Sequence, residues 1–235
     1  MKELPVMIVT GTRRGIGHGI AKYFAGPDYQ VIGCSRGEGP SDLPNYQHYQ
    51  VDLTEEKEVR KFVRTVKKEY KRIDNLVCNV GLVKPSKYVS LTSGDEMGDY
   101  IKTNFLSSFY ICREVSKLMM SQEYGRIVNL SSIMTGIHAA GSSAYSSTKS
   151  AVEEMTKVMA EELAPTGVTC NVVAPSTVMT DTVRDLGEDW LKEMWKMQSM
   201  KRPLQIEELC NVIKFLTAPE SSAVTGQVIN LCKVV

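Results

Sequence analysis

A tyrosine and a lysine stand four residues apart, at Tyr145 and Lys149, in the segment Tyr-Ser-Ser-Thr-Lys. On a helix this spacing places both side chains on one face, one turn apart. A phenol with its ordinary pKa of about 10 is a poor acid or base at neutral pH. Because a neighbouring ammonium favours the phenolate, the pair predicts proton transfer by Tyr145 with its pKa lowered by Lys149.

A serine, Ser132, precedes Tyr145 by thirteen residues and lies two residues after the end of the apolar run Arg126–Leu130. The carboxyl ends of parallel strands form the ligand crevice of open α/β sheets. The Ser132 hydroxyl is therefore expected to hydrogen-bond a substrate carbonyl and to stabilise the alkoxide that develops from it. A Tyr-x-x-x-Lys pair alone is weak evidence, but its combination with Ser132 favours a catalytic site.

These side chains need a scaffold, and the pattern of short apolar runs alternating with longer amphipathic segments predicts repeated strand–helix units around one parallel sheet. We expect a single α/β domain over residues 1–235, with a seven-stranded doubly wound sheet and helices on both faces. Each expected strand is taken to be apolar enough for burial on both faces. The strands are Val6–Thr10, Gln30–Cys34, Tyr46–Val51, Ile73–Asn79, Arg126–Leu130, Val168–Val173 and Gln227–Leu231.

Two helices and one insertion are read from the remaining segments. Helical periodicity predicts a helix over Ala144–Leu163, ended by Pro165 and Gly167, and a second over Glu96–Ser121. The alternation breaks down over 176–202, a stretch rich in Met and Trp. This stretch is expected to form a mobile lid with an apolar underside, although an ordinary packed helix would use the same residues.

A glycine-rich turn links the first strand to the first helix. Glycine at the first position permits the tight turn, at the second lets a pyrophosphate approach the backbone, and at the third allows close helix–strand packing, while the helix N-terminus favours negative charge. The turn therefore predicts dinucleotide binding in a Rossmann fold. The residues expected to contact the cofactor here are Gly11, Thr12, Arg14, Gly15, Ile16 and Gly17.

The end of the second strand carries Ser35 and Arg36 where an acidic residue would select NADH. Arg36 and Arg14 can place guanidinium donors on a 2′-phosphate, so NADP(H) is the expected cofactor. Arg13 is interpreted as a solvated surface charge. Asp52 has two readings, an acceptor for the adenine amino group or a helix N-cap.

The composition excludes several partners. Lys plus Arg number 28 and Asp plus Glu 27, so the net charge of +1 gives no general attraction to nucleic acid or to an anionic membrane. Six scattered cysteines lack the paired spacings of zinc sites or disulfide frameworks, and are expected to be buried or half-buried thiols, with no metal site. The first residues lack the apolar run of a signal peptide, and a cytoplasmic protein is expected.

Four motifs in order make the chain similar to the short-chain dehydrogenase/reductase family, from Met7 to about Gly226. They are Thr10–Gly17, Asn79-Val80-Gly81, the set of Ser132, Tyr145 and Lys149, and Asn171-Val172-Val173-Ala174-Pro175. The resemblance is strongest to the 3-oxoacyl-[acyl-carrier-protein] reductase group. It implies a fourth catalytic residue, Asn104, which would hold a water that links Lys149 to solvent.

The same resemblance implies further contacts and partners. The remaining cofactor contacts would be Leu53, Asn79, Val80, Gly81, Tyr145, Lys149, Pro175, Val178 and Thr180, and the substrate would contact Ser132, Met134, His138, Tyr145 and Ser176. The implied substrate is a small-molecule or thioester carbonyl, which an acyl carrier protein could present. The family also implies a homo-oligomer, a dimer or a tetramer.

The sequence departs from the family pattern at several positions. Cys78 replaces an asparagine before Asn79, and Ser176 replaces the usual glycine after Pro175. The C-terminal Asn230-Leu231-Cys232-Lys233 replaces an Asp-Gly-Gly segment that normally packs at a subunit interface. Glu123 and Thr166 stand where carrier-protein reductases have basic residues, which argues against assuming a carrier-bound substrate.

Three functions remain open at this point. The first is an NADPH-dependent reductase of a β-ketoacyl thioester, a polyketide-like carbonyl or a related ketone. The second is oxidation of a secondary alcohol such as a sugar, polyol or steroid. The third is a cofactor-binding regulator without turnover.

Overall fold

Seven parallel strands form one sheet in the order β3-β2-β1-β4-β5-β6-β7. The computed structural model describes residues 4–180, 192 and 195–234. The strands are β1 (Val6–Thr10), β2 (Gln30–Ser35), β3 (Tyr46–Gln50), β4 (Asn75–Cys78), β5 (Gly125–Leu130), β6 (Val168–Ala174) and β7 (Val228–Asn230). The expected seven-stranded doubly wound parallel sheet is confirmed, and its order reverses between β1 and β4, where ligands bind in such folds.

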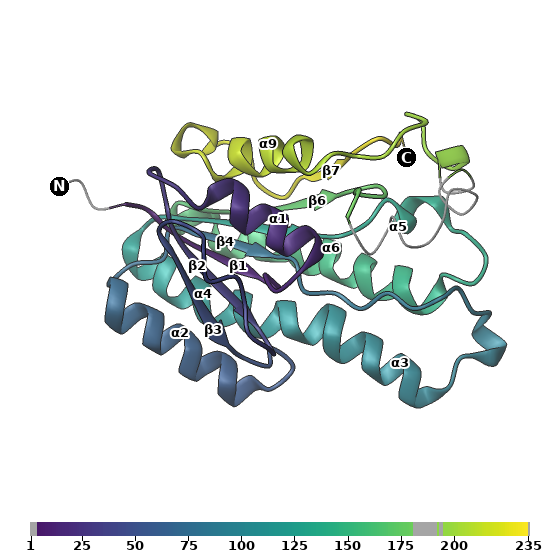
Figure 1. The fold of residues 1–235 in the computed structure, drawn as a ribbon, viewed down its shortest axis with the longest axis horizontal. Coiled ribbons are helices and arrows are strands. Elements are labelled where there is room, and N and C mark those ends of the chain that lie inside the picture. Colours follow the sequence, from purple (N-terminus) through teal and green to yellow (C-terminus); the bar gives the residue numbers. More distant parts are fainter. Residues whose placement is uncertain (1–3, 181–191, 193–194, 235) are drawn as a thin grey trace.

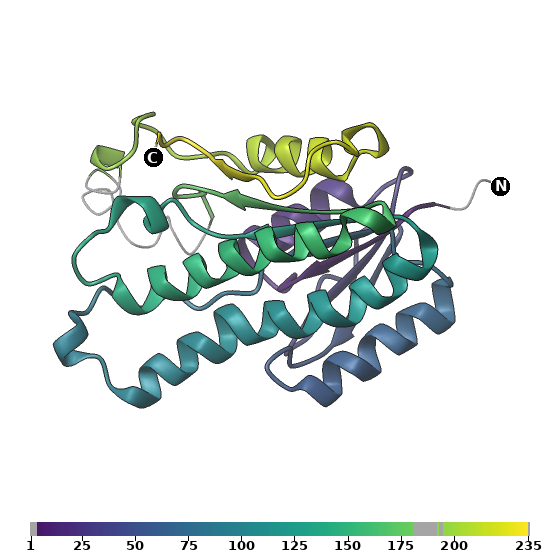
Figure 2. The same cartoon turned by 180° about the vertical axis from the view of Figure 1, so that it is seen from behind.

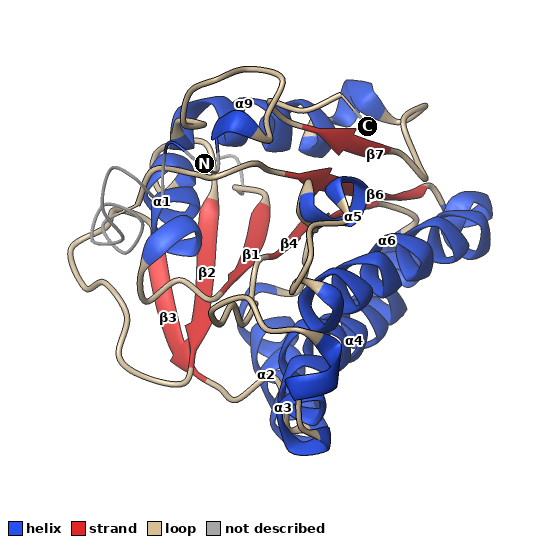
Figure 3. Ribbon diagram, turned by 90° about the vertical axis from the view of Figure 1, so that its right-hand side faces the viewer, coloured by secondary structure: helices blue, strands red, loops and turns tan. Residues whose placement is uncertain are grey.

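Helices cover both faces of this sheet, as expected (Figures 1 and 3). One face carries α1 (Gly15–Phe24) and α9 (Ile206–Thr217). The other carries α2 (Glu56–Tyr70), α4 (Ser107–Gln122) and α6 (Ser143–Leu163), which lie side by side in Figure 2. The short helix α3 (Gly94–Tyr100) lies between β4 and α4, and the short helix α5 (Met134–Ile137) lies in the loop after β5.

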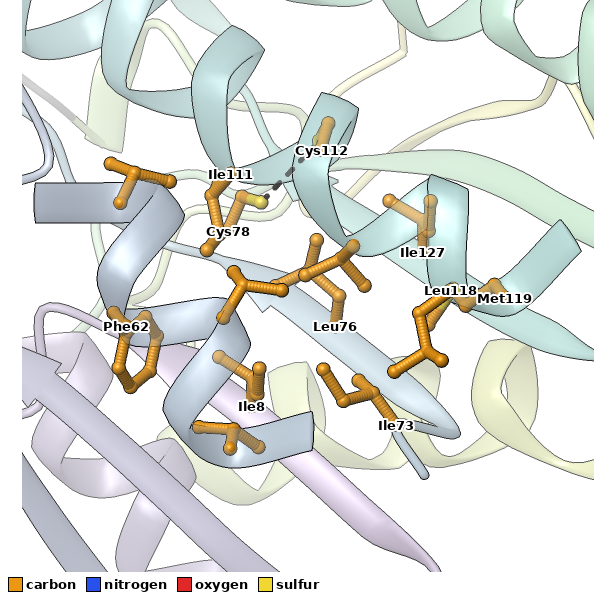
Figure 4. Packing of buried hydrophobic residues seen from close by; sticks show 14 of the residues in the cluster. Ile8, Phe62, Ile73, Leu76, Cys78, Ile111, Cys112, Leu118, Met119 and Ile127 are labelled. Atoms are coloured by element: carbon orange, nitrogen blue, oxygen red, sulfur yellow. Dashed lines mark hydrogen bonds between the residues drawn. The ribbon is translucent and has the colours of Figure 1, made fainter. Parts of the chain in front are cut away.

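Side-chain alternation along the central strands fills two cores. In β1, Val6 and Ile8 pack toward α2 and α4, whereas Met7 and Val9 pack toward α1 and α9. Both faces are apolar because both are covered. Figure 4 shows the first core, in which the Cys78 and Cys112 thiols face each other with their sulfurs 3.6 Å apart.

The edge strand β3 corrects one expectation. Its residues were expected to be buried on both faces, but they are half-buried or exposed. An edge strand has a neighbour on one side only, and the polar residues Gln47, His48 and Gln50 suit that position. The opposite edge, β7, is half-buried as well.

The single helix expected over Glu96–Ser121 is also corrected. Helices α3 and α4 are joined by a π-helical segment, Ile101–Leu106, and Ser107 N–H bonds the carbonyl of Lys102, five residues back. One extra residue per turn rotates the following side chains relative to an α-helix. Amphipathic periodicity does not register this insertion, and it lies where Asn104 enters the core.

All six cysteines lie within the described residues. They are buried free thiols, as expected. Within these residues no group of His, Cys, Asp or Glu is arranged to hold a metal ion. Nor does any described helix combine the length and apolar character needed to cross a bilayer.

Candidate functional site

Three segments carry Asn104, Ser132, Tyr145 and Lys149: the π-helical segment, the loop after β5, and α6. Ser132 follows β5, and its loop is held against the end of β6 because Ile133 N–H donates to the Pro175 carbonyl (3.2 Å). Tyr145 and Lys149 lie in the first two turns of α6. A Cβ placed on Gly81 would lie 3.4 Å from Lys149 Nζ and 3.7 Å from Asn104 Oδ1. Lys149 and Asn104 therefore border the loop that follows β4, and Ser132 is hydrogen-bonded to Tyr145 one turn before Lys149 on α6.

The phenol of Tyr145 differs from the expectation in one respect. Burial raises its pKa, a hydrogen bond with the Ser132 hydroxyl lowers it, and the nearby Tyr100 phenol raises it, with a raised pKa as the net result. The expected lowering by Lys149 is thus not seen, because desolvation dominates. A phenol in this state keeps its proton at neutral pH and can act as a donor.

The ammonium of Lys149 is buried and directed at the protein backbone. Its side chain is 5% exposed, and Nζ donates to the Leu130 carbonyl at the end of β5 (2.8 Å). Burial lowers the Lys149 pKa to about 8, although the neighbouring Cys78 and Glu153 act to raise it. Lys149 is therefore a cation held at an energetic cost.

Asn104 is fully buried within the π-helical segment, and its side chain hydrogen-bonds the backbone of the loop after β4. Its Oδ1 accepts from Leu82 N–H (2.6 Å), and its Nδ2 lies 3.2 Å from the Leu82 carbonyl and 3.1 Å from Thr148 Oγ1. Thr148 immediately precedes Lys149 on α6. Asn104 thus joins three segments that carry the site.

The glycine-rich turn is locked by Asn79. Its Nδ2 donates to the Thr10 carbonyl (3.0 Å), and its backbone N–H donates to Thr10 Oγ1 (2.9 Å). A Cβ on Gly17 would lie 2.3 Å from the Gly11 carbonyl oxygen and 2.4 Å from Asn79 Nδ2, so this position must be glycine. The third glycine therefore acts in helix–strand packing, as predicted.

The middle of this turn leaves room for a ligand. Gly15 has φ +62°, and a Cβ there would meet nothing within 4 Å. It starts α1, which has no side-chain N-cap, and the N-terminal amides and dipole of a helix favour an anion. Arg14, at the N-cap, is exposed and Ile16 is half-buried, whereas Thr12 is fully buried and turns its hydroxyl toward Tyr46 (2.8 Å).

Ser35 and Arg36 stand at the end of β2, with Arg36 exposed. Arg13 is exposed too, but its guanidinium lies over the same loop, since a Cβ on Gly37 would be 3.1 Å from Arg13 Nη1. Sequence reasoning had set Arg13 apart from this site. Three guanidinium side chains, those of Arg13, Arg14 and Arg36, therefore belong to one edge of the molecule.

The segment after β3 settles one of two readings for Asp52. Its Oδ1 accepts from the backbone N–H (2.9 Å) and hydroxyl (2.8 Å) of Thr54, and the N-cap of α2 is Glu55. Asp52 therefore stabilises a turn and does not cap the helix. The neighbouring Leu53 side chain is buried in the core, so only its backbone is available to a cofactor.

The segment after β6 contains a buried polar atom without a partner. Ser176 is 8% exposed, and within the described part of the chain its Oγ makes no hydrogen bond. Such a hydroxyl is costly unless a ligand satisfies it. Pro175 and Val178 are buried beside it, and Thr180 is half-buried. Val178 pairs with Leu204, which fixes the start of the segment.

The middle of the expected lid, 181–191 and 193–194, lies outside the described residues. Its last part is anchored by the C-terminus, since Ser199 and Met200 N–H groups donate to the Cys232 carbonyl (2.9 and 3.2 Å). Cys232 itself has φ +62°. The unusual C-terminal segment is thus in contact with the base of the lid.

The expected substrate side is formed by the loop between Ser132 and Tyr145. Met134 is half-buried, and its N–H lies 3.3 Å from Ser132 Oγ. His138 is exposed with φ +55° at the end of α5, so it lies at the outer rim of this loop. Across from it, Lys87 N–H donates to the Gly141 carbonyl (2.9 Å) and closes the loop after β4 over the same side.

Sequence reasoning missed three residues that support the site. Tyr100 packs edge-on against Tyr145, with ring centroids 6.5 Å apart. Thr148 bonds Asn104, and Glu153 accepts from the hydroxyls of Ser131 and Thr135. Glu153 follows Lys149 by four residues, so helical spacing was an available signal for it. Tyr100 and Thr148 had no comparable signal.

Glu123 and Thr166 lie at the opposite edge of the sheet. They precede β5 and β6 respectively, and a Cβ on Gly167 would lie 2.8 Å from the Glu123 carbonyl oxygen. Ser132 follows the carboxyl end of β5. In one copy of the chain these two positions therefore do not flank the entrance to the site.

Comparisons with known proteins agree with this geometry. Residues 5–190 match the family model of short chain dehydrogenases. The chain is 28% identical to 3-oxoacyl-[acyl-carrier-protein] reductase FabG of Escherichia coli (strain K12), over 97% of this chain and 96% of that protein. It is 29% identical to FabG of Vibrio cholerae, with the same coverage.

Two solved structures share the fold at a TM-score of 0.90 and 29% identity, with 97% of each chain covered. They are ElxO with NADP bound and a tyrosine-to-phenylalanine variant of ElxO with NADPH bound. The family model spans most of the sheet and both halves of the assembled site. On these grounds the chain belongs to the short-chain dehydrogenase family.

Proposed function

We propose that this protein is an NADPH-dependent reductase that converts a ketone to an alcohol, with Tyr145 as the proton donor. The observation that carries the proposal is the convergence of Asn104, Ser132, Tyr145 and Lys149 beside an open glycine-rich turn. The likeness to FabG proteins and to NADP-bound ElxO supports both the reaction class and the cofactor.

The residues around the turn fit a nicotinamide dinucleotide. Gly15 and the α1 N-terminus would hold the pyrophosphate, and the guanidinium groups of Arg14 and Arg36 would hold the 2′-phosphate. The unpartnered Ser176 hydroxyl would bond the nicotinamide carboxamide. When bound, the cofactor supplies the hydride that reduces the carbonyl carbon.

The side chains of the site handle the oxygen of the substrate. The Ser132 hydroxyl, which already interacts with the Tyr145 phenol, orients the carbonyl oxygen toward that phenol. Tyr145 donates its proton to the oxygen as negative charge develops there, and Ser132 stabilises this charge. The Lys149 ammonium stabilises the phenolate that remains.

The proton lost by Tyr145 must be replaced from solvent. Asn104 and Lys149 border the loop at Gly81, and both are buried. We propose that Asn104 holds a water there and that Lys149 passes a proton from it toward Tyr145. By positioning this water, Asn104 would connect the buried Tyr145 phenol to solvent through Lys149.

For the substrate we propose a β-ketoacyl thioester or a polyketide-like ketone. The FabG likeness supports this class, and an acyl carrier protein is then a candidate partner. Glu123 and Thr166 provide no basic docking pair, so a carrier would have to dock on other residues. A free ketone or thioester and a carrier-bound one would both present the same carbonyl group to Ser132.

We further propose a cytoplasmic homo-oligomer, a dimer or a tetramer. Helices α4 and α6 lie together and expose Phe109 (38%), Met120 (43%) and Val158 (50%), a surface suited to a second copy. Six buried free thiols suit a reducing compartment.

The test of this function is the consumption of NADPH and NADH, followed by absorbance. The panel contains acetoacetyl-CoA, a carrier-bound β-ketoacyl substrate, a simple diketone and a keto sugar. We expect turnover with NADPH and the acyl thioesters. Tight NADPH binding without turnover of any ketone, or of any alcohol in reverse, would instead identify a cofactor-binding regulator.

The Ser176 hydroxyl gives a test of cofactor fit. We expect Ser176→Ala to stabilise the free protein by about 1 kcal/mol, because a buried hydroxyl without a partner is removed. The same change should weaken NADPH binding severalfold. Urea unfolding and calorimetric titration measure the two effects.

The matched control for that test is Ser116→Ala. Ser116 is equally buried, at 8% exposed, but its hydroxyl donates to the Arg113 carbonyl (3.1 Å). Its loss should not stabilise the protein or change the cofactor affinity. A destabilised Ser176→Ala protein with unchanged NADPH affinity would refute the proposed contact.

A further inference from the structure

Two side chains of the edge strand β3 join the glycine-rich turn to the end of β2. Tyr46 and His48 are two residues apart and point to one face of the sheet. The Tyr46 hydroxyl lies 2.8 Å from Thr12 Oγ1 and 2.7 Å from His48 Nδ1. His48 Nε2 lies 3.0 Å from Ser35 Oγ and 3.0 Å from the Gly37 carbonyl oxygen. The chain of contacts thus runs from Thr12 to Ser35.

The hydrogen-bond partners determine the tautomer of His48. A carbonyl only accepts, so the contact with Gly37 requires the proton on Nε2. Burial lowers the His48 pKa, which keeps the ring neutral at neutral pH. Nδ1 is then an acceptor that faces the hydroxyls of Tyr46 and Thr12 (2.7 and 3.3 Å).

Two glycines, Gly33 and Gly39, leave the space that the Tyr46 and His48 side chains occupy. A Cβ on Gly33 would lie 1.9 Å from the Tyr46 hydroxyl oxygen and 2.5 Å from Thr12 Oγ1. A Cβ on Gly39 would lie 2.1 Å from His48 Nδ1. Strand β2 has Gly33 where the Tyr46 hydroxyl packs, and the loop after β2 has Gly39 where the His48 ring packs.

The Gly37 carbonyl connects this network to cofactor choice. It accepts from both Ser35 Oγ (2.8 Å) and His48 Nε2 (3.0 Å). To bond a phosphate, the Ser35 hydroxyl must turn its single proton away from Gly37. Because His48 still donates to that carbonyl, Ser35 can do so without leaving this half-buried acceptor unpaired.

We infer that His48 is a positioning residue that acts through Ser35 to favour the 2′-phosphate of NADPH over the 2′-hydroxyl of NADH. This inference rests on the proposed use of NADPH. The ribose hydroxyl of NADH can accept or donate, so it does not require Ser35 to turn. Arg13 and Arg36 supply positive charge at this edge. His48 keeps the Gly37 carbonyl hydrogen-bonded, so the Ser35 hydroxyl can rotate toward a phosphate.

The test is calorimetric titration of the whole protein with NADPH and with NADH. We expect His48→Leu to weaken NADPH binding about tenfold, the effect of one lost hydrogen bond to a charged group, while the NADH affinity changes less than about twofold. His48→Gln, whose amide can still donate to Gly37, should restore the wild-type preference. Gln47→Ala, an exposed change on the same strand, should alter neither affinity.

A double-mutant cycle separates positioning from a merely structural role. If His48 acts through Ser35, Ser35→Ala should lower the NADPH preference by itself, and adding His48→Leu should lower it little further. Equal weakening of NADPH and NADH by His48→Leu, or additive effects of the two changes, would overturn the inference. Ser35→Ala and His48→Gln keep the test decisive if the leucine variant does not fold.

The wild-type protein distinguishes failure of this inference from failure of the proposed function. A wild type that prefers NADPH, with a His48→Leu variant that keeps the same preference, overturns the role of His48 alone. A wild type that binds NADH at least as tightly overturns the proposed cofactor, and the role of His48 falls with it.

Discussion

Replacing Tyr145 with Phe should reduce kcat for ketone reduction by about 10²- to 10⁴-fold, the usual contribution of a positioned acid. The ring and its edge-on contact with Tyr100 are retained, and only the proton donor is removed. NADPH affinity should stay within about twofold, because the proposed phosphate and carboxamide contacts lie elsewhere. Single-turnover kinetics and calorimetric titration measure the two quantities.

Tyr100→Phe is the matched control for this experiment. The Tyr100 hydroxyl accepts from Lys84 N–H (3.1 Å), so its removal alters a loop contact and leaves Tyr145 in place. Its kcat should change only severalfold. If Tyr145→Phe retained more than about a tenth of the wild-type kcat, another group would have to be the acid.

Replacing Lys149 with Met should abolish turnover and make the free protein more stable at neutral pH. Burial lowers the Lys149 pKa from 10.5 to about 8. At neutral pH this buried ammonium thus costs about 3 kcal/mol relative to its unfolded state, offset in part by the bond to Leu130. A net gain of about 1–3 kcal/mol in unfolding free energy is expected, measured by urea titration.

The sign of the pH dependence follows from the same pKa. Between about pH 8 and 10.5 the unfolded chain binds the lysine proton more strongly than the folded chain, so the Lys149 contribution to stability rises with pH. The advantage of Lys149→Met should therefore be largest at neutral pH and shrink as the pH increases through that range. Kinetics should show the complementary effect, with wild-type reduction slowing above about pH 8 as the ammonium loses its proton.

Lys157→Met is the control for these measurements. Lys157 lies two turns further along α6, is exposed, and pairs with Glu154. It should alter neither turnover nor the pH dependence of stability. A Lys149→Met protein that is less stable than the wild type at neutral pH would show that the Leu130 hydrogen bond outweighs the cost of burial.

Local patterns in the sequence were sufficient for most of the fold. The apolar runs of β1, β4, β5 and β6 predicted buried central strands, because a strand covered on both faces must be apolar on both. The glycine-rich turn predicted close packing at Gly17, since its spacing reflects a backbone contact. Helical periodicity placed Tyr145 and Lys149 within the first turns of α6.

Features that depend on neighbours distant in the sequence were not predictable in this way. The exposure of β3 depends on its place at the sheet edge, and the burial of Asn104 depends on a π-helical insertion that hydrophobic periodicity does not record. Glu123 and Thr166 are in positions set by the ends of two strands, at the edge opposite to Ser132.

By itself, the sequence determined which chemical groups the site contains, because residue types and short spacings are local properties. The tertiary structure decided their protonation and contacts: desolvation raises the Tyr145 pKa, and the Leu130 carbonyl accepts a hydrogen bond from the Lys149 ammonium. It also brought His48 of β3 within hydrogen-bond distance of Ser35 of β2. Burial, dielectric environment and contacts between distant segments exist only once the chain is folded, so these properties could not be read from the sequence.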